Sequence, residues 1–101
     1  METFIESYQH SLENICKANQ VKSLFAFGSL VRNDLKSDSD IDLLVEIKEQ
    51  DPFKYADFYF ELKSNLEKLF GKTIDLLEFK CLNNPYLKKE IEDTKILLYS
   101  N

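Results

Sequence analysis

Two aspartates, Asp40 and Asp42, lie one residue apart where a polar stretch passes into IDLLVEI, an apolar run typical of a buried strand. Side chains two residues apart on a strand point to the same face of the sheet, so the two carboxylates are expected to project together. Ionised carboxylates held this close repel each other, and desolvating them costs free energy. A divalent cation removes that penalty. Because Mg²⁺ prefers carboxylate oxygens and leaves room for substrate phosphates, the pair predicts a magnesium site.

A third carboxylate, Asp75, occurs in a similar setting within KTIDLLEF. If the two apolar runs form neighbouring strands, three carboxylates could converge, enough to hold two Mg²⁺ ions for phosphoryl or nucleotidyl transfer. Taken alone, Asp75 is equally consistent with a solvated strand end, and Asp40 is better explained as a turn residue. Asp42, between Ile41 and Leu43, is hard to explain as part of a loop. Jointly the three favour a catalytic site.

The Gly28-Ser29 pair ends the preceding apolar run, KSLFAF. Exposed backbone N–H groups at such a turn can bind a phosphate, and glycine permits the phosphate to approach closely. Gly-Ser pairs are common, so the signal is weak by itself. Its spacing from the aspartates makes it a candidate phosphate-binding turn.

A calcium-binding EF-hand loop is a rival interpretation of the same stretch. Asp38, Asp40 and Asp42 match its first three acidic positions, and Glu49 falls at the twelfth. Leu43, however, occupies the position that needs glycine for the sharp turn. The residues that follow resemble a strand and not a helix, so we reject the EF-hand.

The wider pattern of apolar residues and turn signals predicts seven elements. In chain order these are a helix over 3–18, strands over 22–27 and 40–47, a helix that starts after Asp51-Pro52 and ends at Phe70-Gly71, a strand over 73–79, a short helix opened by Asn84-Pro85 with Leu87 and Ile91 inward, and a strand over 96–99. This order predicts an α+β fold, a mixed sheet with helices packed on it, in one domain over 1–101.

Composition narrows the function classes. The net charge is −5, which argues against a protein that binds nucleic acid directly through a basic face. No apolar run is long enough to cross a membrane, no signal peptide is evident, and Cys16 and Cys81 form no C-x-x-C pair, so we expect a cytoplasmic protein with reduced, structural thiols. His10, the single histidine, is expected to be a solvated helix residue; its isolation excludes multi-histidine zinc sites.

The stretch GSLVRNDLKSDSDIDLLVEI resembles the signature of the nucleotidyltransferase superfamily related to DNA polymerase beta. The signature is Gly-Ser, an arginine three residues later, and Ser-Asp-x-Asp in a strand. The resemblance is strongest to the minimal nucleotidyltransferases, which are partners of HEPN-domain proteins in toxin–antitoxin pairs, and it covers most of the chain. Val31 and Asn33 depart from the alanine and glycine often found in the family; the bulk of Val31 could lower activity.

The resemblance implies a role for each motif residue. Carried over by position, Gly28, Ser29, Arg32 and Ser39 are nucleotide-binding, and Asp40, Asp42 and Asp75 are the catalytic carboxylates and metal ligands. An ion pair with Asp34 or a loop carboxylate is an equal alternative for Arg32. Asp75 would also activate the acceptor hydroxyl.

Two functions follow from the resemblance. The first is an antitoxin that uses Mg²⁺ to transfer AMP from ATP to a tyrosine hydroxyl of a cognate HEPN toxin. The alternative is a catalytically weak antitoxin that neutralises its HEPN partner by binding alone. Intact carboxylates favour the first.

The long helix over 53–70 carries more aromatic residues than one face needs. At 100° per residue, one broad stripe should pack on the sheet. Phe53, Ala56 and Phe60 fall on nearly the opposite side and form a candidate interface with another protein chain. The alternative is that Tyr86 or Leu87 covers them.

Overall fold

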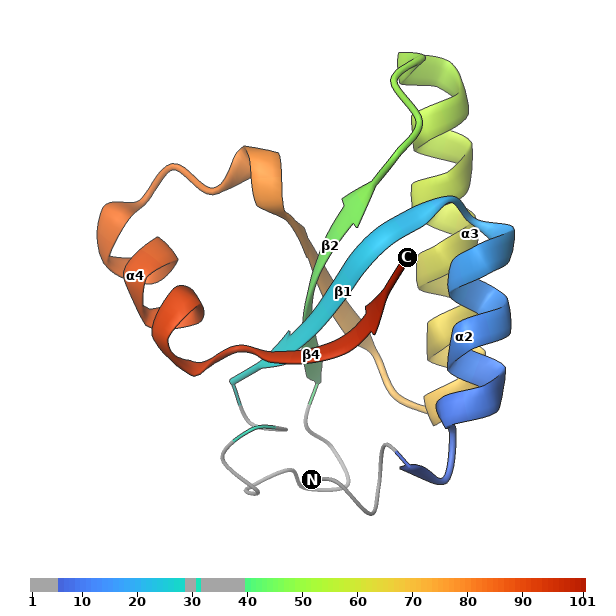
Figure 1. The fold of residues 1–101 in the computed structure, drawn as a ribbon, viewed down its shortest axis with the longest axis horizontal. Helices are drawn as coiled ribbons and strands as arrows, with labels where there is room; N and C mark the ends of the chain where they lie inside the picture. The colour runs from blue at the N-terminus through green and yellow to red at the C-terminus, as the bar shows by residue number, and fades with distance from the viewer. Residues whose placement is uncertain (1–5, 29–30, 32–39) are drawn as a thin grey trace.

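A computed structural model of the chain describes residues 6–28, 31 and 40–101 (Figure 1). Its elements are α2 (Gln9–Ala18), β1 (Val21–Phe27), β2 (Ile41–Ile47), α3 (Pro52–Phe70), β3 (Ile74–Glu78), a 3₁₀ turn η1 (Phe79–Cys81), α4 (Pro85–Thr94) and β4 (Ile96–Ser100). The expected order of helices and strands is confirmed. The pattern did not predict η1.

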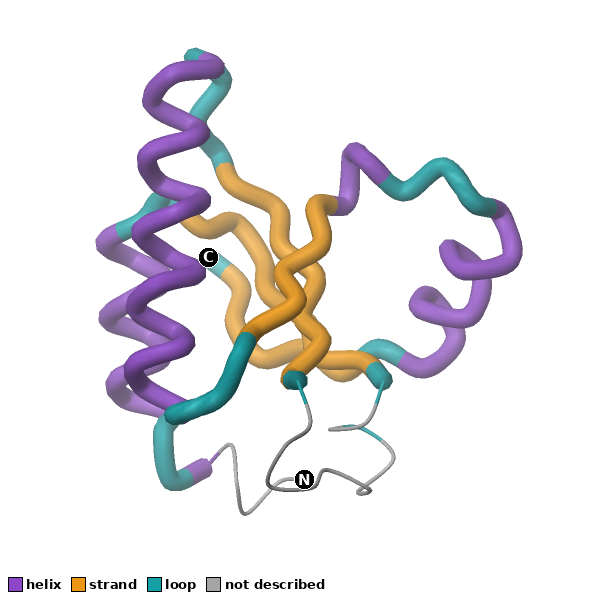
Figure 2. The backbone as a smooth tube through the Cα atoms, turned by 180° about the vertical axis from the view of Figure 1, so that it is seen from behind, coloured by secondary structure: helices purple, strands orange, loops and turns teal. Residues whose placement is uncertain are grey.

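The four strands form one mixed sheet in the order β3-β2-β1-β4. β2 pairs in parallel with β3, whereas β1 pairs antiparallel with both β2 and β4. Helices α2 and α3 lie together on one side of the sheet, and α4 lies on the other (Figure 2). The predicted α+β architecture is therefore confirmed.

The main core lies between the sheet and the α2–α3 pair. It includes Leu12 and Cys16 of α2, Leu24 and Ala26 of β1, Ile41, Leu43 and Val45 of β2, and Leu62, Leu66 and Phe70 of α3. Tyr55, Phe58, Tyr59 and Leu69 pack against this cluster. The broad stripe predicted for the long helix is thus the side of α3 that faces the sheet.

Local signals set the ends of the helices as expected. The Asp51 carboxylate accepts a hydrogen bond from the backbone N–H of Phe53 at 2.9 Å and caps α3. Gly71 closes the same helix in the left-handed conformation, at φ 64°. The side chain of Asn84 likewise caps α4 by accepting from Tyr86 N–H at 2.9 Å.

Side chains form hydrogen bonds with backbone groups on the two edge strands of the sheet. On β3, Glu67 Oε2 accepts a hydrogen bond from Ile74 N–H at 3.0 Å, and the Tyr59 hydroxyl donates to Leu76 O at 2.6 Å. On β4, the Gln9 side chain donates to Leu98 O at 3.4 Å. These contacts reduce the tendency of exposed edges to pair with another chain.

Three smaller expectations have clear outcomes. His10 is exposed on α2, as expected. Both cysteines are free; Cys16 is buried in the core, but Cys81 is exposed, so the description as a structural thiol is wrong for Cys81. Among the described residues, no helix has the length and apolar character needed to cross a membrane.

Candidate active site

Strand pairing places two of the predicted carboxylates side by side. Asp42 of β2 is the direct partner of Asp75 on the parallel strand β3. Ile41 and Leu43 point into the core between sheet and helices, so the alternation of side chains directs Asp42 to the opposite face. Residues in register on parallel strands share a face, which gives Asp75 the same direction. Asp42 is half-buried and Asp75 is exposed.

Asp40 lies just before β2 and is exposed. Within the described part of the chain, no three His, Cys, Asp or Glu side chains form a group that could hold a metal ion. The predicted convergence of three carboxylates is therefore absent among these residues. Asp40 lies one residue before β2, outside the paired register that places Asp42 opposite Asp75.

Gly28 follows β1 and contacts the Asp42 carboxylate. Phe27, the last residue of β1, is the cross-strand partner of Asp42. A Cβ atom built on Gly28 would collide with Asp42 Oδ2 and lie 3.1 Å from Asp42 Cγ. Gly28 also has φ 71°, in the left-handed region that other residues enter at a cost. Both the close approach and the backbone conformation require glycine here.

A cavity of about 300 Å³ opens beside this contact, between the sheet and α4. Its lining residues are Phe27, Gly28, Val31 and Asp42 from the β1–β2 side and Leu87, Glu90, Ile91 and Thr94 from α4. It combines a carboxylate and a glycine turn with apolar walls. That is the usual composition of a small-molecule site.

The α4 lining was not identified from the sequence. Residues 87, 90, 91 and 94 have the spacing of one helix face, and that spacing could have identified them together. Ile91 is buried as expected, and Leu87 faces the same cavity between α4 and the sheet, but its side chain stays exposed. The Thr94 hydroxyl donates to Glu90 O at 2.7 Å.

Three predicted nucleotide-binding residues, Ser29, Arg32 and Ser39, lie outside the described residues. Val31 between them is described. It is partly buried, packs against the core cluster and lines the cavity beside Gly28. The Val31 side chain therefore forms part of the cavity wall, which is the place where its added bulk could lower activity.

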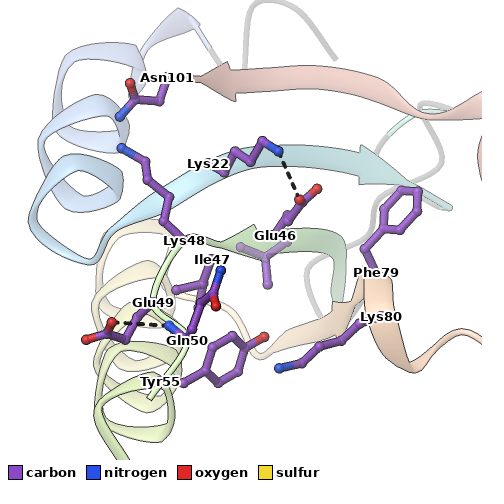
Figure 3. Close-up of a pocket in the computed structure, with 11 residues that line it drawn as sticks. Lys22, Glu46, Ile47, Lys48, Glu49, Gln50, Tyr55, Phe79, Lys80 and Asn101 are labelled. Atoms are coloured by element: carbon purple, nitrogen blue, oxygen red, sulfur yellow. Dashed lines mark hydrogen bonds and ion pairs between the residues drawn. The ribbon is translucent and has the colours of Figure 1, made fainter. Parts of the chain in front are cut away.

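A larger hollow of about 960 Å³ lies around the far end of β2, away from the aspartates (Figure 3). Its polar groups largely engage one another. Lys22 pairs with Glu46 at 3.4 Å, and Lys80 Nζ lies 3.6 Å from the centre of the Tyr55 ring. Size alone would favour this hollow. The smaller cavity is the better candidate because it contains the strand carboxylate and the glycine turn.

The tyrosine in the larger hollow is not a ready nucleophile. Burial raises the pKa of Tyr55, and the hydrogen bond from its hydroxyl to Glu78 raises that pKa further. This hydrogen bond is 2.6 Å long. Tyr55 therefore stays protonated at neutral pH and supports the packing of α3 on β3.

The candidate interface on α3 is open to solvent. Phe53 is 85% exposed and Phe60 is 67% exposed, with Ala56 between them partly exposed. Tyr86 is itself 86% exposed, and Leu87 lines the cavity beside α4. The alternative in which Tyr86 or Leu87 covers the strip is therefore wrong for the residues that the structure describes.

The site has the features of a protein that handles nucleoside triphosphates. A glycine turn contacts one strand carboxylate, a cavity adjoins that turn and Asp42, and a second carboxylate lies on the next parallel strand. Residues 10–101 match the family model described as "Polymerase beta, Nucleotidyltransferase". The chain belongs to this nucleotidyltransferase family.

Individual proteins are similar to the chain over most of its length. A Methanocaldococcus jannaschii protein, provisionally named a protein adenylyltransferase, is 42% identical over 77 residues, which is 76% of each chain. A solved structure described provisionally as a minimal nucleotidyltransferase matches with a TM-score of 0.70 and 27% identity, covering 90% of this chain and 89% of that one.

A further structural match shares the fold. It is a chain in the complex of tri-AMPylated Shewanella oneidensis HEPN toxin with MNT antitoxin. The TM-score is 0.64 at 16% identity, over 96% of this chain and 73% of that one. The resemblance to minimal nucleotidyltransferases seen in the sequence is thus confirmed.

Proposed function

We propose that this chain is a cytoplasmic antitoxin that transfers AMP from ATP to a tyrosine hydroxyl of a HEPN-domain toxin. The observation that carries the proposal is the contact of Gly28 with Asp42, with Asp75 opposite on the next strand. Its similarity to a protein named an adenylyltransferase supports AMP as the group transferred. The fold shared with a chain of a HEPN–MNT complex supports the partner.

The two strand carboxylates are suitable ligands for Mg²⁺. Asp42 and Asp75 offer only carboxylate oxygens on one face of the sheet, and Asp42 also lines an open cavity. Mg²⁺ is usually held by one or two carboxylates together with substrate phosphates, so two strand carboxylates suffice. Asp40, exposed one residue before β2, is the further candidate ligand. When bound, Mg²⁺ would neutralise phosphate charge during the transfer.

Gly28 and Asp42 orient the nucleotide in this proposal. The missing side chain at Gly28 lets triphosphate oxygens approach the backbone at the end of β1, and Ser29 would contribute its hydroxyl there. Because Asp42 lies on a strand between core residues, its backbone is held beside that turn. A rigid platform of this kind lowers the entropic cost of aligning the reacting groups.

Asp75 is the proposed general base. Its exposure leaves it accessible to a tyrosine on another protein, while its register with Asp42 keeps it beside the phosphates. The tyrosine hydroxyl gives its proton to Asp75 as its oxygen bonds to the α-phosphorus. The bond from that phosphorus to the bridging oxygen of the β-phosphate breaks, and pyrophosphate leaves.

Transfer can be tested directly with purified proteins. The chain is incubated with ATP, Mg²⁺ and a HEPN toxin, and AMP attached to toxin tyrosine is measured by intact-mass and peptide mass spectrometry. Asp42→Asn should abolish transfer. Asp93→Asn is the matched control, because Asp93 sits in an exposed ion pair with Lys89 that contributes little. Equal transfer by wild type and Asp42→Asn would refute the proposal.

Neutralisation by binding alone is a second candidate, favoured by one observation. Phe53 and Phe60 are exposed on α3, across the sheet from the face that carries Asp42 and Asp75. A partner bound to that strip would be held at a distance from the catalytic face. If Asp42→Asn still neutralises the toxin in cells while transferring no AMP, binding is the operative mechanism.

A further inference from the structure

Helix α4 forms one wall of the candidate nucleotide cavity but is weakly anchored. Of its ten residues, all of them described, only Ile91 is buried. In both views α4 extends away from the sheet and is separated from α2 and α3 by the strands (Figures 1 and 2). A wall with so little buried surface needs another fixed contact if the cavity is to keep its shape.

Lys95, the residue directly after α4, provides such a contact. Its Nζ atom lies 4.4 Å from the centre of the Phe25 ring on β1 and 5.1 Å from that of Phe79 in η1. The same ammonium group pairs with Glu92 of α4 at 3.0 Å. The Lys95 backbone N–H closes the helix by donating to Ile91 O at 2.8 Å. One side chain thus joins α4, β1 and η1.

The environment of Lys95 strengthens these contacts. Its side chain is only 18% exposed, and the attraction of a cation to aromatic rings increases as water is removed. The positive charge also lies at the C-terminal end of α4, where the helix dipole favours a cation. By contrast, Lys89 on the same helix pairs with Asp93 at 3.1 Å, but its side chain is 77% exposed.

We propose that Lys95 is a positioning residue for nucleotide binding, which fixes α4 against the sheet and thereby keeps the cavity beside Asp42 in its binding-competent shape. This inference rests on the proposed function, because it takes the cavity to be the nucleotide site. Lys95 lines no part of the cavity and acts through Leu87, Glu90 and Ile91 of α4. Loosening α4 lowers the fraction of molecules ready to bind, and the apparent affinity falls by that fraction.

Four variants separate positioning from general stability. Lys95→Met keeps the length of the side chain but removes its charge, and Lys95→Arg keeps the charge over both rings. Lys89→Met is the matched control on the same helix. Phe79→Leu removes one of the two rings and serves if Lys95→Met does not fold. For each variant, the Kd of ATP with Mg²⁺ is measured by calorimetry, KM and kcat by AMP transfer, and backbone hydrogen exchange without nucleotide.

For Lys95→Met we expect an increase of roughly tenfold in Kd and KM with little change in kcat, since one desolvated cation–π contact corresponds to a population shift of that order. Hydrogen exchange should accelerate in α4 but not in β1 or β2. Lys95→Arg and Lys89→Met should both show wild-type ATP affinity and wild-type hydrogen exchange in α4. Phe79→Leu should change the affinity and the exchange in the same direction as Lys95→Met.

Three outcomes distinguish failure of this inference from failure of the proposed function. If exchange in α4 is the same in Lys95→Met as in wild type, Lys95 does not fix the helix and the inference is overturned. The same holds if wild type and Lys95→Met bind ATP equally. If wild type itself binds no ATP, the proposed function fails, and accelerated exchange would then support only the anchoring of α4.

Discussion

Replacing Gly28 by alanine tests whether the glycine turn and the strand carboxylate form one unit. The new Cβ would collide with Asp42 Oδ2 and lie 3.1 Å from Asp42 Cγ and 3.4 Å from its Cβ. Either the carboxylate moves aside or the backbone of the turn shifts. Both responses displace the groups proposed to hold the phosphates.

Gly71 is a natural reference for this substitution. It has φ 64° against 71° for Gly28, but a Cβ built on it meets no atom within 4 Å. Gly71→Ala therefore reports the backbone strain alone, about 1–2 kcal/mol for a left-handed residue. For a chain of this size, that strain lowers Tm by roughly 4–8 °C per kcal/mol. Gly28→Ala carries the same strain plus a collision that costs about 1–3 kcal/mol if nothing yields.

The assay compares the two variants in thermal unfolding, ATP binding and AMP transfer at a temperature where both are folded. Gly71→Ala should lose stability but keep wild-type transfer. Gly28→Ala should lose roughly 10²-fold in transfer, which is the cost of misplacing a reacting group by about 1 Å. If the two variants transfer AMP equally well, the contact between Gly28 and Asp42 has no catalytic role and the reasoning is wrong.

Four further results are expected. ATP should bind much more tightly with Mg²⁺ than without it in calorimetry; equal affinities would exclude a metal-dependent site. Asp75→Asn should keep a good part of ATP binding but lose roughly 10²–10⁴-fold in transfer, the usual contribution of a general base, and near-normal transfer would show that its role is misassigned. Phe53→Ser with Phe60→Ser should weaken binding to the toxin with the fold intact by circular dichroism; unchanged binding and self-association would show that the strip is no interface. Burial, and secondarily the charge of Glu13, raises the pKa of Cys16 from 9.0 to about 12. The contribution of the neutral thiol to the free energy of unfolding is therefore complete below pH 9 and is lost as the pH rises towards 12. In urea unfolding measured against pH, the free energy of unfolding of Cys16→Ala should fall less steeply than that of wild type over this range.

Local signals made most of the fold predictable. Asp51 before proline and Gly71 after Phe70 mark the ends of α3 within the sequence itself, because capping depends on residues a few positions apart. Asn84 marks the start of α4 in the same way. The alternation around Asp42 likewise gave its face of the sheet, since a strand's period of two is a local property.

The cavity was not predictable by the same reasoning. Its second wall comes from α4, and no local pattern states which part of a sheet a helix end will approach. Leu87 is an apolar residue at a core-like spacing, yet it is exposed because it lines the open cavity between α4 and the sheet, whereas Ile91 is the buried residue of α4. Asp40 shows the same limit, because it lies one residue before β2 and outside the paired register that relates Asp42 to Asp75.

The mixed topology of the sheet explains why the site can form at all. Gly28 follows the end of β1, whereas Asp42 and Asp75 are each the second residue of their strands. Because β1 is antiparallel to β2, and β2 is parallel to β3, the end of one strand meets the starts of the other two. Were β1 parallel to β2, Gly28 would adjoin Ile47 instead, about 17 Å along β2 from Asp42 at 3.3 Å per residue. The glycine turn and both carboxylates therefore lie at the same end of the sheet only because β1 and β2 are antiparallel, and the pairing must be established before the phosphate site exists.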